Sequence, residues 1–392
     1  MNASGFFMPC LYFQTMKQLT FLLLALLLQQ VTLAQFTVRL VVTDVATKKN
    51  EDIYVAGNFN NWNPKDENYK LKVFGGTRKS VVLKDLAAGV YAFKFTRGGF
   101  EKVETTADGR DIADRVLEVN GDLSLDLTIA GWKDDYPEKP KRYTASPQVK
   151  ILDTAFSMPQ LNRQRRIWVY LPKGYASSGK TYPVLYLQDG QNLFNEQTAA
   201  FGEWGVDECL DSLQQKIGKE CIVVGIDHGA NKRMTEYNPY THAQYGIGEG
   251  KEYAAFLAKT LKPFIDGKFR TKKSAANSFI GGSSMGAVIS LYAITQYPES
   301  FGGGLLFSPA FWVAPELYAD VEKFTPTTAP KLYFYAGGKE SATMVADMKK
   351  MTDLFDKKQN IQTRKVVSPL GQHNEGYWRT EFAEAWSWLF RD

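Results

Sequence analysis

The fold of this chain is decided by the stretch Phe279-Ile280-Gly281-Gly282-Ser283-Ser284-Met285-Gly286. Residues 278–280 are typical of the end of a buried strand, and residues 287–294 predict a buried helix that stops before Pro298. A strand, a small-residue turn and a helix around G-x-S-x-G predict an elbow that holds a serine in a strained turn above a sheet. Ser284 has glycines two residues before and after it, whereas Ser283 would need a glycine at position 285. The pattern therefore selects Ser284 as a nucleophile.

Around this stretch, strands and helices alternate from residue 148 to residue 392. Strand patterns fall at residues 166–171, 182–187, 222–226, 304–307, 332–335 and 364–367, and helix patterns at residues 206–217, 253–264 and 381–390. This alternation predicts an α/β domain with a doubly wound, mostly parallel sheet. Sheets of this kind carry their chemistry at the carboxyl ends of the strands.

A nucleophilic serine needs a histidine that takes its proton and a carboxylate that orients the histidine. With this elbow the order along the chain is serine, acid, histidine. The chain has three histidines, and His373 alone follows the last predicted strand, so it is the predicted base. His228 could line the rim of a pocket, although a surface loop is the preferred interpretation, and His242 is expected in solvent.

The acid should follow the strand at residues 332–335. Glu340 is the predicted acid, and Asp347, one helical stretch later, is the alternative. A carboxylate at a helix amino terminus is the other interpretation of Glu340, because the helix dipole favours one there.

An oxyanion hole takes two backbone N–H groups. One is predicted at Met285, directly after the nucleophile. The other is predicted at Gln191, in the loop that follows the strand ending at Leu187, where Gly190 permits a close turn. An ordinary strand-ending turn is the alternative interpretation of Asp189-Gly190.

The amino terminus predicts a signal peptide over residues 1–34. Lys17 precedes an apolar run at residues 21–28, and small residues follow at 31–34. Residues 1–15 are interpreted as an upstream extension, with Met16 as the natural start. The apolar run is too short to span a bilayer, so we expect a secreted or periplasmic protein that is not an integral membrane protein.

Residues 35–131 predict a small immunoglobulin-like β-sandwich. Short strand patterns occur at residues 36–43, 53–55, 81–83, 91–95, 116–119 and 123–129, with Gly and Asn turns between them. Residues 132–147 are charged and proline-containing, which predicts a linker.

Composition narrows the function classes. The chain has 392 residues, 44% of them hydrophobic, which is compatible with two or three domains that have normal cores. The formal net charge of +5 is small and is not gathered in a basic stripe, so no nucleic-acid partner is expected. No motif calls for a metal or an organic cofactor, and the oligomeric state is left open. Cys209 and Cys221 are expected as free thiols, with a disulfide as the alternative.

Residues 55–64, Val-Ala-Gly-Asn-Phe-Asn-Asn-Trp-Asn-Pro, resemble the starch- and glycogen-binding carbohydrate modules, as does the turn at residues 89–91. The resemblance implies a sugar platform at Trp62, with a second aromatic residue near Phe100. Ala113 stands where binding members usually carry an asparagine. Structural or interdomain packing is therefore the preferred role of Trp62, and we expect weak glycan binding or none.

Four segments resemble the putative-esterase family of α/β-hydrolases: residues 187–194, 233–237, 282–286 and 307–312. The resemblance covers roughly residues 148–392. The family includes feruloyl and acetyl-xylan esterases, siderophore trilactone esterases and S-formylglutathione hydrolases. It implies a pocket shaped by Asp189, Arg233, Glu236 and Trp312, and a salt link between Arg233 and Glu236 is an open alternative to substrate contact.

These features predict an exported serine esterase that forms an acyl-enzyme, acting on feruloyl or acetyl esters of plant polysaccharide fragments. A siderophore trilactone is the alternative substrate. An acyltransferase with the same residues, and a non-catalytic carbohydrate-binding protein, are the alternatives of other classes.

Overall fold

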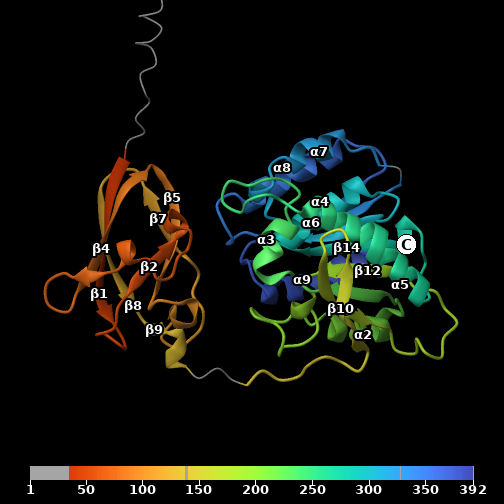
Figure 1. Ribbon diagram of the computed structural model, residues 1–392, viewed down its shortest axis with the longest axis horizontal. Coiled ribbons are helices and arrows are strands. Elements are labelled where there is room, and N and C mark those ends of the chain that lie inside the picture. The colour runs from red at the N-terminus through yellow and green to blue at the C-terminus, as the bar shows by residue number, and fades with distance from the viewer. Residues whose placement is uncertain (1–34, 137–139, 327, 392) are drawn as a thin grey trace, which may run out of the picture. The chain divides into compact units, whose positions relative to one another are not determined.

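The computed structural model describes residues 35–136, 140–326 and 328–391, which form two compact units (Figure 1). Unit 1 ends at Lys139 and unit 2 begins at Pro140. The predicted signal peptide, residues 1–34, lies outside the described residues. Among the helices that are described, none is long and apolar enough to cross a membrane.

The described part of unit 1 contains two larger sheets that share one core. One sheet has the strand order β3-β4-β1-β8 and the other β2-β5-β7. Their strands are β1 (Gln35–Val45), β2 (Tyr54–Gly57), β3 (Lys72–Val73), β4 (Lys79–Ala87), β5 (Gly89–Thr96), β7 (Arg115–Val119) and β8 (Leu123–Ile129). Alternate residues of β1 are buried together with Phe93 and Phe95 of β5. The strand segments predicted from the sequence all overlap these strands, and the immunoglobulin-like class stays a prediction.

The boundary of unit 1 lies later than the sequence indicated. Trp132 forms the short strand β9 (Gly131–Trp132), which pairs with β6 (Glu104–Thr105), and its side chain is fully buried in the core. Its indole Nε1 donates a hydrogen bond to the Thr47 carbonyl at 3.2 Å. The predicted linker at residues 132–147 therefore begins with core residues, because a single buried tryptophan inside a charged segment gives no periodic pattern.

Unit 2 is built on a sheet whose described strands have the order β10-β11-β13-β12-β14-β15-β16-β17. The strands are β10 (Val149–Met158), β11 (Arg163–Tyr170), β12 (Val184–Gln188), β13 (Ile222–Ile226), β14 (Ser278–Ser283), β15 (Gly303–Phe307), β16 (Lys331–Gly337) and β17 (Gln362–Ser368). In this order, each strand from β13 through β12 to β17 pairs in parallel with the next. At one edge β10 pairs antiparallel with β11, and β11 pairs antiparallel with β13. β10 was not predicted, because few of its residues are buried and its sequence shows no apolar alternation.

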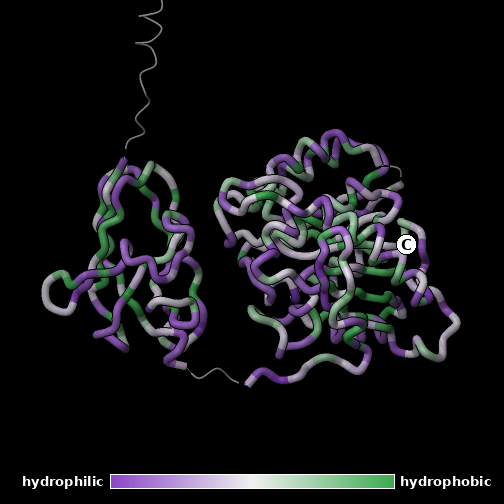
Figure 2. The backbone as a smooth tube through the Cα atoms, viewed as in Figure 1, coloured by the Kyte–Doolittle hydropathy of each residue, from purple (hydrophilic) through white to green (hydrophobic). Residues whose placement is uncertain are grey.

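Helices cover both faces of this sheet, as the doubly wound prediction requires. One core joins the sheet to α4 (Gly250–Phe256), α5 (Lys262–Lys268), α6 (Met285–Gln296), α7 (Leu317–Lys323) and α8 (Met344–Asp356). The core on the other face joins it to α2 (Val206–Ile217) and α9 (Glu375–Leu389). Figure 2 shows the hydrophobic residues gathered along the central strands. The predicted helix 253–264 is divided between α4 and α5 by a π-helical turn, η7 (Leu257–Leu261).

The parallel strands bring six loops together at one edge of the sheet. β12, β13, β14, β15, β16 and β17 end at Gln188, Ile226, Ser283, Phe307, Gly337 and Ser368. The residues that follow these ends include each member of the predicted triad. The order of the strands therefore decides which of those residues can meet.

Candidate active site

Ser284 occupies a strained turn between β14 and α6. Its backbone angles are φ 56° and ψ −121°, a conformation that non-glycine residues rarely adopt. Its N–H donates a hydrogen bond to the Phe307 carbonyl of the neighbouring strand at 2.9 Å. A Cβ added at Gly282 or Gly286 would lie 3.0–3.1 Å from the side chain of Gln188, at the end of β12. The predicted elbow is thus observed, and its glycines allow β12 to approach it closely.

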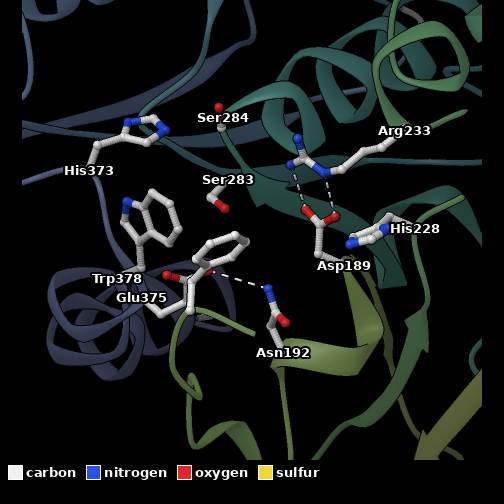
Figure 3. A pocket seen from close by; sticks show the side chains of 10 residues that line it. Asp189, Asn192, His228, Arg233, Ser283, Ser284, His373, Glu375 and Trp378 are labelled. Carbon is white, nitrogen blue, oxygen red and sulfur yellow. Dashed lines mark hydrogen bonds and ion pairs between the residues drawn. The ribbon is translucent and has the colours of Figure 1, made fainter. Parts of the chain in front are cut away.

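A pocket of about 260 Å³ opens beside Ser284 (Figure 3). Its lining consists of Asp189, Asn192, Phe201, His228, Arg233, Ser283, Ser284, His373, Glu375 and Trp378. These residues come from the end of β14, from the segments that follow β12, β13, β14 and β17, and from α9. Ser284 precedes α6 and His373 follows β17, so all the elements from α6 to β17 lie between them in the sequence. The two residues nevertheless line one cavity.

His373 is paired with Glu340. The His373 Nδ1 atom lies 2.8 Å from the Glu340 Oε2 atom, and the Glu340 side chain is only 1% exposed. The other carboxylate oxygen of Glu340 accepts hydrogen bonds from the Ser308 hydroxyl and the Gly337 N–H, both at 2.6 Å. Asp347, the alternative acid, lies in the first turn of α8 and does not line the pocket. The carboxylate that can orient His373 is Glu340.

Trp378 supports this pair from α9. Its indole Nε1 donates to the Ser308 hydroxyl at 2.8 Å, so that Ser308 links Trp378 to Glu340. The indole also packs edge-on against the His373 ring, with centroids 5.1 Å apart. In Figure 3 the His373 ring extends toward Ser284 above Trp378. The imidazole is thus held on two sides while part of it remains open to the pocket.

The loop after β12 faces the elbow from the opposite side. Asp189 has left-handed backbone angles, φ 56° and ψ 46°, and begins the 3₁₀ turn η5 (Gly190–Asn192). A Cβ at Gly190 would lie 2.8 Å from the backbone of β13, so only glycine allows this turn to pack there. In η5 the N–H groups of Asn192 and Leu193 donate back into the turn, which leaves that of Gln191 outside these bonds.

Arg233 binds Asp189 and so holds the loop after β12 in position. It belongs to α3 (Arg233–Glu236), and its Nε and Nη2 atoms donate to the two Asp189 oxygens at 2.7 and 2.9 Å. Burial opposes the charged guanidinium, but the Asp189 carboxylate prevails and raises the pKa of Arg233 above its usual range. A planar fork on a carboxylate fixes orientation as well as distance. The pair therefore holds the turn that carries Gln191.

Two residues expected in the pocket lie outside its described lining. Glu236 is fully buried and pairs with Arg163 at 2.8 Å and Arg165 at 2.7 Å, and not with Arg233 as the sequence had left open. Its carboxylate packs where a Cβ at Gly229 would lie, which supports the loop after β13. Trp312 is 48% exposed in the turn η9 (Phe311–Val313).

The pocket contains residues that sequence reasoning did not select. Asn192, Phe201, Glu375 and Trp378 line it, and so does His228, for which a surface loop was preferred. Glu375 lies two positions after His373, and Asn192 one position after Gln191, so proximity in sequence was an available signal for both. Phe201 is 81% exposed and carries no motif. His242 lies outside the pocket, half-buried and stacked on Tyr245.

The predicted sugar platform lies in unit 1. Trp62 is half-buried and has a positive φ of 55°, in the turn that follows η1 (Asn58–Asn60). Phe100 is 44% exposed at the start of η3 (Phe100–Lys102), and Ala113 is exposed. An exposed Phe100 and a half-buried Trp62 are compatible with either role proposed for them.

One group of carboxylates in the described residues has the spacing of metal ligands. Oxygen atoms of Glu203, Asp207 and Glu208 lie within 4.8 Å of one another. Asp207 accepts a hydrogen bond from the Ser146 N–H at 2.6 Å, and burial raises the pKa of its carboxyl to about 7. None of the three lines the pocket beside Ser284.

Known proteins resemble this chain in sequence and in fold. The chain is 26% identical to the uncharacterized protein YbbA of Bacillus subtilis, over 58% of this chain and 92% of that protein. It is 29% identical to an endo-1,4-beta-xylanase/feruloyl esterase of Xylanibacter ruminicola, over 38% of this chain and 20% of that protein. The crystal structure of the enterobactin esterase FES from Shigella flexneri superposes with a TM-score of 0.53 at 17% identity, over 87% of this chain and 88% of that one. Residues 158–389 match the family described as Putative esterase, so the chain belongs to that family of carboxylic ester hydrolases.

Proposed function

We propose that the protein hydrolyses carboxylic esters through an acyl-enzyme on Ser284. The observation that carries this proposal is the 2.8 Å contact between His373 Nδ1 and Glu340 Oε2 beside a pocket that both His373 and Ser284 line. Such a contact fixes the tautomer of the imidazole, leaving Nε2 as the base that can accept the serine proton.

The reaction then proceeds in two halves. The Ser284 hydroxyl attacks the ester carbonyl carbon while His373 Nε2 takes its proton, and the imidazolium is stabilised by Glu340. The N–H groups of Met285 and Gln191 are proposed to bind the oxyanion, since Met285 begins α6 and has no acceptor within its helix. His373 returns the proton to the leaving alcohol. Water, activated in the same way, releases the acid and restores Ser284.

For the substrate we propose an acylated glycan fragment outside the cytoplasm, with a feruloyl or acetyl group as the acid. The sequence of residues 1–34, which predicts a signal peptide, and the feruloyl esterase among the relatives support this proposal. A siderophore trilactone is the competing substrate, supported by relatives that carry enterobactin esterase names.

For unit 1 we propose a fold of the carbohydrate-module class with weak glycan affinity. Ala113 offers no polar contact where an asparagine would bind a sugar. The measurement is calorimetric titration of the full chain with maltooligosaccharides and xylooligosaccharides, with Trp62→Ala as the comparison. Saturable binding that Trp62→Ala abolishes would replace the packing role of Trp62 by a sugar platform.

The deciding experiment is a substrate panel with the purified chain and its Ser284→Ala variant. The panel contains p-nitrophenyl acetate, feruloylated and acetylated xylan fragments, and a catechol-siderophore trilactone. We expect turnover by the native chain and none by Ser284→Ala above background. Acyl transfer to an added alcohol in preference to water would indicate an acyltransferase. Glycan binding without turnover of any ester would indicate a non-catalytic protein.

A further inference from the structure

The charged residues of the pocket beside Ser284 differ in whether they have a counter-charge. Asp189 is paired with Arg233 through two hydrogen bonds, and His373 is paired with Glu340. Glu375 has no cationic partner within ion-pair distance among the described residues. Its side chain contact is with the Asn192 amide, whose Nδ2 donates to Glu375 Oε1 at 3.3 Å (Figure 3). One carboxyl group of the pocket is thus left without a cation.

Glu375 is held in the wall of the pocket. The residue is only 6% exposed and begins α9, two positions after His373. Asn192 contacts it from η5, and a Cβ added at Gly202 would lie 3.4 Å from the Glu375 Cβ, so the loop before α2 packs on it as well. A residue that is 6% exposed has little water to satisfy its carboxyl group, and what remains exposed lines the cavity.

The start of α9 satisfies part of this carboxylate, because Glu375 lies in the first turn and accepts a hydrogen bond from its own backbone N–H. Asn374 caps the helix, since its Oδ1 accepts the Tyr377 N–H at 3.3 Å. The Asn192 Oδ1 atom is buried without a hydrogen-bond donor but has almost no exposed surface, so the acceptor offered to the pocket is the Glu375 carboxylate. A buried acceptor without a donor is costly, so a ligand that supplies donors would be favoured here.

We infer that Glu375, held by the Asn192 amide, forms a donor-binding subsite, which accepts hydrogen bonds from a hydroxyl or ammonium group near the scissile ester. A carboxylate at the same place would be repelled by the Glu375 carboxylate and be disfavoured. This inference rests on the proposed ester hydrolysis at Ser284, and it adds a selectivity that the triad does not provide. The ligand chemistry, a donor on the substrate, is common to polyols and amines.

The subsite should also depend on pH. Burial raises the pKa of Glu375 above its usual value. A hydrogen bond from its own backbone N–H lowers the pKa, the Asp189 carboxylate raises it, and His373 and Arg233 lower it, with burial prevailing. A carboxyl with a raised pKa is charged above that value and neutral below it. Preference for an ammonium group should therefore be present at high pH and weaken as pH falls through the Glu375 titration. His228 also lines the pocket.

The test compares four methyl esters that differ only in the group on carbon 3 of the acid: butyrate, 3-hydroxybutyrate, 3-aminobutyrate and 3-carboxybutyrate. Propyl acetate and 2-hydroxyethyl acetate place the same hydroxyl difference on the alcohol. The measured quantity is the ratio of kcat/KM between two esters. The two esters differ in intrinsic reactivity, but this difference is the same for the native enzyme and the variant, so it cancels when their ratios are compared. In Glu375→Gln the ammonium-to-carboxylate ratio should fall by about tenfold or more, as expected for hydrogen bonds to a charged group.

The hydroxyl ratio, on the acid or on the alcohol, should fall by roughly three- to tenfold in Glu375→Gln. Glu384→Gln is the matched control, because Glu384 lies on the same helix, is exposed to solvent and pairs with Arg364. It should keep the native ratios. If Glu375 had only a structural role, Glu375→Gln would change the melting temperature, or lower kcat/KM for all the esters by the same factor. The ratios would then stay as in the native enzyme.

Ratios that agree within about twofold between the native enzyme and Glu375→Gln, on both arms, would overturn the inference. If Glu375→Gln does not fold, the ammonium-to-carboxylate ratio of kcat/KM is measured for the native enzyme between pH 5 and pH 8. A ratio that does not change with pH contradicts a subsite that depends on the titration of Glu375. Absence of any hydrolysis by the native enzyme would instead contradict the proposed function. Hydrolysis with unchanged ratios rejects the subsite alone.

Discussion

The elbow that carries the proposed nucleophile Ser284 and the proposed acid–base arm reach the same pocket by different means. The elbow is one continuous segment, in which β14, Ser284 and α6 follow one another and Gly282 and Gly286 permit the close approach of β12. The acid–base arm, defined as Glu340, His373, Ser308 and Trp378, comes from four separate segments after β15, β16 and β17 and on α9. The elbow is therefore fixed by local sequence, whereas the arm exists only once the sheet has assembled.

The difference shows where each region is vulnerable. Strain at Ser284 is imposed by backbone geometry, so that replacing its side chain removes chemistry without removing the turn. The arm depends on a chain of hydrogen bonds from Trp378 through Ser308 to Glu340, and a single deletion there leaves a buried polar atom without a partner. Each of the following substitutions tests one side of this comparison.

The largest effect is expected in the elbow. Ser284→Ala should lower the turnover of p-nitrophenyl acetate by roughly four to six orders of magnitude, as for other triad serines. Ser283→Ala, its neighbour in the same strand end, is the matched control and should lose little. Circular dichroism of both variants checks that the fold is kept. Loss of turnover in Ser283→Ala together with normal turnover in Ser284→Ala would mean that the reading frame of the elbow is different.

The second-largest effect is expected for Glu340, the proposed acid of the acid–base arm. Glu340→Gln should reduce kcat by up to about four orders of magnitude, because the amide cannot stabilise the imidazolium and favours another tautomer. Asp347→Asn in the same preparation provides the comparison, since Asp347 lies on α8 and does not line the pocket. A large loss in Asp347→Asn with little loss in Glu340→Gln would transfer the role of the acid.

A smaller effect should follow from Ser308→Ala, which breaks the chain of hydrogen bonds without replacing Ser284, Glu340 or His373. Its hydroxyl donates to Glu340 Oε1 and accepts from Trp378 Nε1, so that both lose a buried partner. We expect kcat to fall about tenfold while KM changes little, which corresponds to the cost of one buried unpaired group. Unchanged kcat would show that Gly337 and the loop backbone are enough to hold Glu340.

The smallest effect is expected from packing in the elbow. A Cβ in Gly286→Ala would lie 3.1 Å from both Asp189 Oδ2 and Gln188 Cβ, so the loop after β12 must shift. We expect a loss of about 1–3 kcal/mol in the free energy of unfolding, measured in urea. Gly267→Ala on α5 is the control, because its Cβ would meet no atom within 4 Å, and it should be neutral or stabilising. Equal stability of both variants would contradict tight packing at the elbow.

Sequence alone determined what is encoded within single segments. The elbow and its reading frame at Ser284, the alternation that leads to a doubly wound sheet, and the chain order of Glu340 and His373 were all accessible, because each depends on periodicity or on neighbours in sequence. The strand patterns of unit 1 were accessible for the same reason, but buried Trp132 was assigned to a linker, since one apolar residue has no period.

Only the tertiary structure decided which distant side chains meet. It paired His373 with Glu340 in preference to Asp347, gave Arg233 to Asp189 and Glu236 to Arg163 and Arg165, and brought Glu375 and Phe201 into the pocket. Several of these partners are tens of residues apart, and their distances are set by strand order and by the loops at one sheet edge. Local sequence carries no signal for such pairings, because the same carboxylate fits a helix start, a salt link or a catalytic pair until the sheet places a partner beside it.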